Sequence, residues 1–297
     1  MRRSDEAPSA IDRREFVHRV ATISVASVAT RVSVLEPLAG DASSGSPTRL
    51  RQLGPIGIQV YTVRSLMPRD PDGTLAALAS IGYAEVELAG LYGNTPAAMR
   101  QMLDRHGLAA VSAHMSLTDM RRDWPRALDD AATLGQRYIV CSSFAESERS
   151  VDAFHRNAHE LNELAAAARQ HGIQFGYHNH MYEFAPASGV IPYDILLTEC
   201  DPQLVQMEVD LMWMTKGGGD PVAYFHRYPG RFPMVHVKDM TSDGTMVDVG
   251  QGSIDFRRIF AQSELAGIKH YFVEHDEPPS PIADARTCYE YLRHLTF

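Results

Sequence analysis

Short apolar runs alternate with helix-like segments eight times between residue 56 and the C-terminus, and this alternation limits the folds open to the chain. Each run has the length and composition of a buried strand, and most of the intervening segments end at a glycine, as helices commonly do. The predicted strands cover residues 56–63, 83–88, 108–115, 138–143, 173–180, 205–212, 234–239 and 271–275. The predicted helices cover residues 72–81, 95–106, 123–134, 151–171, 192–199, 221–227, 256–266 and 282–295.

Eight strand–helix units in about 250 residues predict an α/β protein with a (β/α)8 TIM barrel. A doubly wound parallel sheet is the alternative, but it more often has fewer strands. In addition, none of the strand–helix turns carries the GxGxxG signature of a dinucleotide site. We expect residues 49–297 of the 297-residue chain to form the barrel.

The first 48 residues have a different character. Arg13 and Arg14 are followed by a mildly apolar stretch over residues 20–35 and then by small residues. This order resembles a twin-arginine export signal, whose apolar region is weaker than that of an ordinary secretory signal. The sequence therefore predicts that residues 1–48 are an export signal with a linker, and that the protein works in the periplasm or outside the cell. A disordered basic leader is the alternative.

The charge and the cysteine pattern argue against several classes of protein. The net charge of -9 disfavours a nucleic-acid partner, because phosphate binding needs a basic face. After the leader no apolar run reaches the roughly 18 residues of a membrane span, so we expect none. Cys141, Cys200 and Cys288 lie far apart, which argues against a zinc–thiolate site or a disulfide framework. We therefore expect a small-molecule partner, and a homo-oligomer stays open.

Polar side chains recur at alternating positions near the ends of seven predicted strands. Residues two apart on a strand share a face, and buried charges are too costly to serve as packing filler. TIM barrels keep their active sites at the C-terminal ends of the strands, so we expect these side chains to converge there. The pairs are Gln59 and Tyr61, Glu85 and Glu87, Ser112 and His114, His178 and His180, Glu208 and Asp210, His236 and Lys238, and Glu274 and Asp276.

The last four strands each supply one residue of a candidate metal site, namely His178, Asp210, His236 and Glu274. Imidazole and carboxylate ligands suit Mn²⁺, Zn²⁺, Co²⁺ or Fe²⁺, and open positions on the ion indicate catalysis rather than structure. We expect one divalent ion, with Mn²⁺ as the first choice. His180 has the same parity as His178 and is the alternative ligand, while any one of these histidines taken alone could be a hydrogen-bonded core residue.

Several segments resemble the sugar phosphate isomerase/epimerase family with its xylose-isomerase-like TIM barrel, over residues 54–297. The matching segments are IQVYTVR (58–64), YAEVEL (83–88), GYHNHMYEF (176–184), EVDLMW (208–213), VHVKD (235–239) and VE (273–274). The resemblance implies a metal held by Glu, Asp, His and Glu from strands five to eight, and the last three match Asp210, His236 and Glu274. This chain has His178 where the first Glu is expected, which puts a two-carboxylate epimerase mechanism in doubt.

We expect an enzyme that removes a proton next to a sugar carbonyl through a metal-stabilised enediolate. Glu274 would be both ligand and base, and His180 or Lys238 would return the proton. The metal and a nearby histidine would favour neutral Lys238, while a structural pairing of Lys238 with Glu208 or Asp239 is the alternative. The residues expected to contact the substrate are Gln59, Tyr61, Glu87, His114 and Trp213, although His114 could instead pair with Glu87.

Three functions follow from this site. The first is a sugar isomerase or epimerase. The second is a lyase that eliminates the C1 substituent of a 3-keto-glycoside, which the missing strand-five carboxylate and the predicted export favour. The third is a sugar- or metal-binding barrel without turnover. Only Arg64 and Lys238 are placed to meet a phosphate group, so the substrate is expected to be a sugar or glycoside that need not be phosphorylated.

Overall fold

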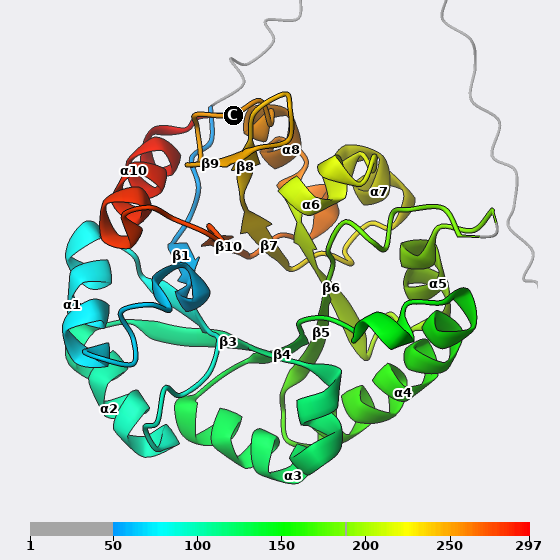
Figure 1. Cartoon of the computed structure of the whole chain (residues 1–297), viewed down its shortest axis with the longest axis horizontal. Coiled ribbons are helices and arrows are strands. Elements are labelled where there is room, and N and C mark those ends of the chain that lie inside the picture. Colours follow the sequence, from blue (N-terminus) through cyan, green and yellow to red (C-terminus); the bar gives the residue numbers. More distant parts are fainter. Residues whose placement is uncertain (1–49, 188) are drawn as a thin grey trace, which may run out of the picture. The chain divides into compact units, whose positions relative to one another are not determined.

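The computed structural model describes residues 50–187 and 189–297; the predicted export signal lies outside these residues. Eight strands close into a barrel in the order β1-β10-β7-β6-β5-β4-β3-β2, and helices surround it (Figure 1). All neighbouring strands of the barrel are parallel, and Ile56 of β1 pairs with Tyr271 of β10 where the barrel closes. The predicted (β/α)8 barrel is confirmed.

The barrel strands are short and almost completely buried, as expected when helices cover the outside and side chains fill the inside. They are β1 (Ile56–Gln59), β2 (Glu85–Leu88), β3 (Ala109–Met115), β4 (Tyr138–Cys141), β5 (Gln174–His178), β6 (Val205–Asp210), β7 (Met234–Val237) and β10 (His270–Val273). Two further short strands, β8 (Asp239–Met240) and β9 (Met246–Val247), form an antiparallel pair in the loop after β7.

A polar capping residue precedes most of the outer helices, and several of the helices start with a proline. Asp70 and Thr95, for example, each accept a backbone N–H of the first turn and precede a proline. The helices are α1 (Pro71–Ile81), α2 (Pro96–His106), α3 (Leu117–Leu134), α4 (Val151–Gln170), α5 (Pro192–Glu199), α6 (Leu211–Lys216), α7 (Pro221–Arg227), α8 (Phe256–Phe260), α9 (Ser263–Ala266) and α10 (Pro281–His294), with 3-10 turns η1 (Val60–Val63) and η2 (Glu146–Glu148). Within the described part of the chain, no helix has the length and hydropathy needed to cross a membrane.

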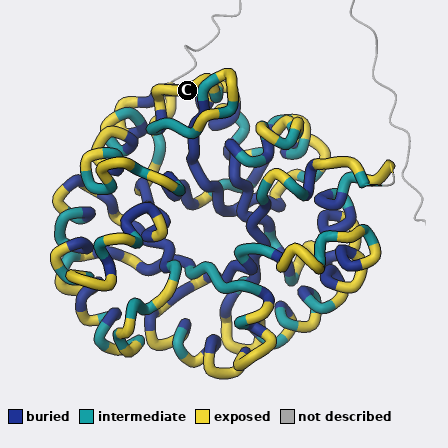
Figure 2. The backbone as a smooth tube through the Cα atoms, in the orientation of Figure 1, coloured by how far each residue is buried: buried dark blue, intermediate teal, exposed yellow. Residues whose placement is uncertain are grey.

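Apolar packing occupies the wall and the N-terminal half of the barrel. Buried residues line the inner ring, whereas the exposed residues lie on the outer faces of the helices (Figure 2). A separate cluster fills the barrel interior and consists of Val111, Tyr138, Val140, Met234 and Phe272. Because these side chains occupy the N-terminal half, the C-terminal half is left for the polar groups.

Glu85 does not belong to the polar group at the C-terminal end, where the sequence had placed it. It is the first residue of β2, and its Oε2 lies 2.8 Å from Nδ1 of His270, the first residue of β10. The pair therefore lies at the opposite end of the barrel. The alternation of a strand predicts which face a side chain occupies, but it does not predict its height along the barrel axis.

All eight predicted strands were longer than the observed ones, and at the ends of the first and sixth a polar side chain begins a turn. The Gln59 side chain accepts the N–H of Tyr61 at 3.0 Å, and residues 60–63 form η1 instead of strand. Asp210 Oδ1 accepts the N–H of Trp213 at 2.8 Å and begins α6, a helix the sequence did not predict. The fifth strand likewise ends at His178, so His180 lies beyond it.

Helix α3 begins earlier than the predicted residue 123. Ser116 caps its N-terminus by accepting the N–H of Asp119 at 3.1 Å, and a kink at Asp123, with φ -159° and ψ 70°, separates residues 117–122 from the rest. Pro125 follows the kink, which is where a new helical segment tolerates proline. The sequence thus missed a short helical segment that begins at the C-terminal end of β3.

Candidate metal centre

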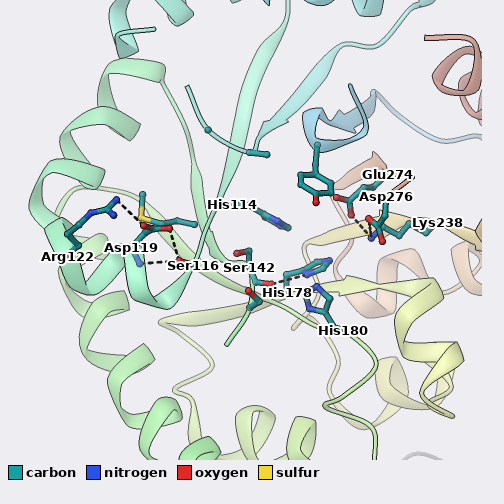
Figure 3. Close-up of a pocket in the computed structure, with 15 residues that line it drawn as sticks. His114, Ser116, Asp119, Arg122, Ser142, His178, His180, Lys238, Glu274 and Asp276 are labelled. Carbon is teal, nitrogen blue, oxygen red and sulfur yellow. Dashed lines mark hydrogen bonds and ion pairs between the residues drawn. The ribbon is translucent and has the colours of Figure 1, made fainter. Parts of the chain in front are cut away.

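A cavity of 680 Å³ opens at the C-terminal ends of the barrel strands. Figure 3 shows Lys238, Glu274 and Asp276 together at one end of it. His178 and His180 lie beside that end. A second polar group from the start of α3 lies at the far end, and it consists of Ser116, Asp119 and Arg122.

The four predicted metal ligands come together. His178, Asp210, His236 and Glu274 each offer one ligand atom, and these atoms all lie within 4.8 Å of one another. His178 Nε2 is 3.5 Å from Asp210 Oδ2, and His236 Nδ1 is 2.7 Å from Glu274 Oε2. All four side chains are buried. Each residue stands within one position of the C-terminal end of its strand, so closure of the barrel brings them to one place.

The donor atoms of this set fit a divalent cation. Within the described residues His178 Nε2 and Asp210 Oδ2 are buried without a hydrogen-bond partner, which is costly for polar atoms. Lys238 Nζ lies 3.1 Å from Asp210 Oδ2, but without the angle of a hydrogen bond. Burial lowers the pKa of His178 well below its ordinary value, and His236 and His114 act in the same direction, so its imidazole is neutral and can donate a lone pair.

A second set of candidate ligands lies deeper, formed by His114, His178, Glu208 and His236 with ligand atoms also within 4.8 Å of one another. His114 Nε2 is 2.6 Å from Glu208 Oε2, and His236 Nε2 is 3.3 Å from the same oxygen. The Glu208 carboxylate is thus already engaged by two imidazoles. Among the described residues, each set contains two unpartnered donor atoms, His178 Nε2 with Asp210 Oδ2 in the predicted set and His178 Nε2 with Glu208 Oε1 in the deeper one. We keep the predicted set as the candidate for the ion, because Asp210 Oδ1 and Oδ2 accept from no described imidazole whereas Glu208 Oε2 faces two.

Glu87 lies below the ligands and holds one of them. Its Oε2 accepts hydrogen bonds from His236 Nε2 at 2.6 Å and from Gln59 Nε2 at 2.8 Å. A carboxylate on the far nitrogen of a ligating histidine fixes the tautomer and orientation of the ring. Gln59 and Glu87 are 0% exposed and do not line the cavity, so their position suits orientation of His236 and not the substrate contact predicted for them.

Lys238 pairs with carboxylates other than those predicted. Its Nζ lies 2.7 Å from Glu274 Oε2, 2.8 Å from Asp276 Oδ1 and 3.1 Å from Asp210 Oδ2, whereas the sequence had suggested Glu208 or Asp239. Burial opposes the charge of Lys238, but these three carboxylates outweigh burial and raise its pKa. The surrounding side chains thus favour the ammonium form and not the neutral amine that was predicted.

The other ligands carry large pKa shifts. Burial opposes protonation of His236, but Glu208 and Glu274 outweigh it and raise its pKa well above the ordinary value. Burial opposes ionisation of Glu274, but Lys238 and His236 outweigh it and hold its pKa well below the usual range. The buried group is thus a network of paired charges, which a bound cation would redistribute.

His180 lines the cavity beyond the end of β5. Burial lowers its pKa to about 3, with His178 and Lys238 acting in the same direction, so the ring is neutral at neutral pH. Its backbone N–H donates to Glu183 Oε2 at 2.9 Å, and Glu183 Oε1 accepts the hydroxyl of Tyr177 at 2.7 Å. Glu183 is fully buried. Sequence reasoning missed it, although it belongs to the GYHNHMYEF segment.

Of the two aromatic residues predicted to contact the substrate, one lines the cavity and the other does not. Tyr61 lines the cavity and is 41% exposed, with the Arg64 guanidinium 4.1 Å from its ring centroid. Trp213 does not line the cavity; its ring lies 5.6 Å from Lys238 Nζ. His114 lines the cavity and pairs more closely with Glu208 than with Glu87, at 2.6 Å against 3.2 Å.

Asp239 organises the loop after β7 and was missed as a functional residue. Its buried carboxylate accepts backbone N–H groups at 2.9 to 3.2 Å. A carboxylate with so many donors is held firmly and in turn fixes the loop beside Lys238. The donors belong to Met240, Gly250, Gly252 and Ile254.

Residues 75–293 match the sequence profile of the family described as xylose isomerase-like TIM barrel. The chain belongs to this family. It is 27% identical to an inosose dehydratase of Geobacillus kaustophilus (strain HTA426), over 75% of this chain and 87% of that protein. A solved sugar phosphate isomerase/epimerase from Parabacteroides distasonis ATCC 8503 superimposes with a TM-score of 0.72 and 25% identity, over 85% of this chain and 98% of that one.

The fold is also shared with the IOLI protein, solved with a bound zinc atom, at a TM-score of 0.64 and 16% identity over 80% of this chain and 96% of that one. The inosose dehydratase and the sugar phosphate isomerase/epimerase named above are enzymes. This chain is an enzyme of the same xylose isomerase-like superfamily. The alternative of a barrel without turnover is therefore set aside. In this chain, the cluster of His178, Asp210, His236 and Glu274 could hold a metal ion.

Proposed function

We propose that this enzyme is a lyase that removes the proton beside the carbonyl of a keto-sugar and expels the group on the next carbon. A 3-keto-glycoside, which would lose its C1 substituent, fits this reaction. The observation that carries the proposal is the contact of 2.8 Å between Lys238 Nζ and Asp276 Oδ1, because both groups line the cavity and form an acid beside a base. The similarity to a dehydratase supports elimination.

His178, Asp210, His236 and Glu274 would hold one divalent ion, for which we propose Mn²⁺ because two imidazoles and two carboxylates suit it. When bound, such an ion polarises a carbonyl and stabilises the negative charge that develops on its oxygen as the adjacent C–H is broken. With the ion bound, the hydrogen bond from His236 Nε2–H to Glu87 would keep the Nδ1 lone pair of His236 directed at the ligand set.

Asp276 and Lys238 complete the proton balance. Asp276 takes the proton, and the electrons of the broken C–H bond form a carbon–carbon double bond as the C–O bond on the next carbon breaks. Lys238, whose pKa is raised, donates a proton to the departing oxygen, which leaves as water or an alcohol. Asp276 then returns its proton to Lys238 across 2.8 Å, so elimination needs no external acid or base.

This assignment changes the role expected of Glu274. Its Oε2 already contacts His236 Nδ1 at 2.7 Å and Lys238 Nζ at 2.7 Å, and its lowered pKa makes it a weak base. Burial raises the pKa of Asp276, which makes that carboxylate the stronger base of the two. We assign Glu274 to the ion and to Lys238, and His180 to the substrate as a neutral hydrogen-bonding group.

Isomerisation or epimerisation of a free ketose is the second candidate, supported by the similarity to a sugar phosphate isomerase/epimerase. It uses the same proton abstraction. An epimerase must also return the proton to the opposite face of the same carbon, and the second carboxylate implied by the family for that task is replaced by His178. This replacement favours elimination.

Proton NMR of the Mn²⁺-loaded protein in D2O, with free ketoses and a 3-keto-glucoside side by side, separates the candidates. Release of the aglycone with a new enone supports the lyase. Deuterium at the carbon beside the carbonyl of an intact sugar supports the isomerase and overturns the lyase. An Asp276→Asn variant that keeps its metal but loses turnover supports the assigned base, whereas undiminished turnover refutes it.

We also propose that the enzyme is exported through its twin-arginine sequence and works in the periplasm. Fractionation of cells expressing the full chain, followed by N-terminal sequencing of the mature protein, tests this. Retention in the cytoplasm with an intact N-terminus would refute it, and replacement of Arg13 and Arg14 by Lys should block export if the proposal is right.

A further inference from the structure

We infer that the cavity accepts an uncharged glycoside of two rings and not a sugar phosphate. The reacting ring lies beside His178, Lys238 and Glu274, and the second ring lies against an arm formed by Ser116, Asp119 and Arg122 (Figure 3). The position of the reacting ring rests on the proposed function; the site for the second ring does not.

The size of the cavity is the first reason. Its 680 Å³ is well inside the range of about 300–1,000 Å³ that accommodates drug-sized ligands, which is more space than one sugar ring needs. The metal-ligand end and the arm lie at opposite ends of this single cavity, with His114 and Ser142 between them in Figure 3. A ligand that contacts both ends must therefore extend beyond one ring.

The chemistry of the arm is the second reason. Arg122 Nη2 lies 2.9 Å from Asp119 Oδ1, and the Ser116 hydroxyl donates to Asp119 Oδ2 at 2.7 Å. Ser116 also caps α3, so its hydroxyl is already committed. Arg122 keeps several N–H donors and Asp119 keeps free lone pairs. A neutral pair with both donors and acceptors suits sugar hydroxyl groups, which need both.

The balance of charge is the third reason. Among the cavity-lining residues that the structure describes, the permanent cations are Arg122 and Lys238, and each is already paired with carboxylate. The carboxylates that line the cavity are Asp119, Glu274 and Asp276. Away from the ion, where Glu274 is a ligand, a phosphate would meet side chains whose positive charges are each matched by a carboxylate, Arg122 by Asp119 and Lys238 by Asp276.

Arg64, the other cation that the sequence suggested for a phosphate, is also engaged. Its Nη2 lies 3.3 Å from Glu277 Oε1, its guanidinium stacks on Tyr61 and it does not line the cavity. Arg64, Arg122 and Lys238 therefore each have a carboxylate partner that offsets their charge toward a phosphate. The family likeness to sugar phosphate enzymes does not extend to a phosphate site in this cavity.

Titration calorimetry of the metal-loaded protein with unreactive sugars tests the inference without requiring turnover. The probes are methyl glucoside with one ring, glucose disaccharides of different linkage, and glucose 6-phosphate. We expect at least one disaccharide to bind at least tenfold more tightly than methyl glucoside, and glucose 6-phosphate to bind no more tightly than methyl glucoside. The tightest binding by glucose 6-phosphate, or no gain from a second ring in any disaccharide, would overturn the inference.

Two variants locate the second ring. We expect Arg122→Ala and Asp119→Ala to weaken disaccharide binding at least fivefold and to change methyl glucoside binding less than twofold. Arg126→Ala is the matched control, because Arg126 is an exposed residue of the same helix, 3.8 Å from Asp130, that does not line the cavity. Equal weakening of both probes by Arg122→Ala would refute the placement.

The calorimetry also separates this inference from the proposed lyase. A disaccharide preference in a protein that reacts with no keto-sugar would support the two-ring site and refute the reaction. Turnover of keto-sugars without any disaccharide preference would support the reaction and refute the two-ring site.

Discussion

Glu87 provides the sharpest test of the metal centre, because it touches a ligand without being one. Its Oε2 accepts both the His236 Nε2–H, at 2.6 Å, and the Gln59 amide, at 2.8 Å. When an ion replaces the proton on Nδ1, the hydrogen bond from Nε2–H to Glu87 would leave the lone pair of His236 on Nδ1, on the side of Glu274. Glu87→Leu removes the acceptor while keeping much of the side-chain volume. The imidazole can then change tautomer or rotate away from the ion.

The magnitude follows from the bond that is lost. A hydrogen bond to a charged group contributes about 1.5–3 kcal/mol, and outer partners of metal ligands typically change metal affinity about 10–100-fold. We therefore expect the Kd for Mn²⁺ to rise about 10–100-fold in Glu87→Leu. Glu87→Gln should have a smaller effect, because an amide oxygen at the Oε2 position can still accept both hydrogen bonds but carries no charge.

The assay is competition for Mn²⁺ between the protein and a chromophoric chelator, with circular dichroism to confirm folding. Glu85→Leu is the matched control: it also removes a Glu–His pair from β2, but at the far end of the barrel, 2.8 Å from His270. We expect it to change stability and not Mn²⁺ affinity. An Mn²⁺ Kd within twofold of wild type in folded Glu87→Leu would refute the role of Glu87.

Three further predictions concern single residues. Lys238→Met should lower kcat by at least 100-fold, because the acid of the elimination is lost, while the metal content stays near one ion per chain. Steady-state kinetics and elemental analysis measure the two quantities, and an unchanged kcat would contradict the prediction. Asp239→Ala should lower the free energy of unfolding, measured in urea, by about 3 kcal/mol, because four backbone N–H groups lose their acceptor. A change below about 1 kcal/mol would contradict this reasoning. Burial raises the pKa of Glu183 from 4.5 to about 7, so the folded state holds a proton that the unfolded chain releases. The contribution of Glu183 to the free energy of unfolding is therefore greatest below about pH 4.5, and it declines by up to about 3 kcal/mol as the pH rises to about 7. Glu183→Gln cannot lose this proton, so urea midpoints over this range should fall less in Glu183→Gln than in wild type; parallel profiles would contradict the prediction.

The sequence alone predicted the barrel and the four residues that meet at the candidate metal centre. Both depend on patterns that are local along the chain: eight strand–helix units, and polar residues at alternating positions of a strand. Because parallel strands in a closed barrel end on the same side, His178, Asp210, His236 and Glu274 could be placed together without knowing any distance between them. The matching family profile confirms the barrel, and the structure brings these four residues within reach of one ion.

Only the tertiary structure decided what each of the other polar side chains does. Alternation gives the face of a strand but not the height in the barrel, so Glu85 was placed at the wrong end. The hydrogen bond of Glu87 to His236 could not be predicted for the same reason. The partners of Lys238 come from β6 and from the chain after β10, and they depend on how the strands are staggered. The arm that carries Arg122 depends on a kink in α3. These features arise from distances between segments far apart in sequence, and those distances are set only when the whole barrel closes.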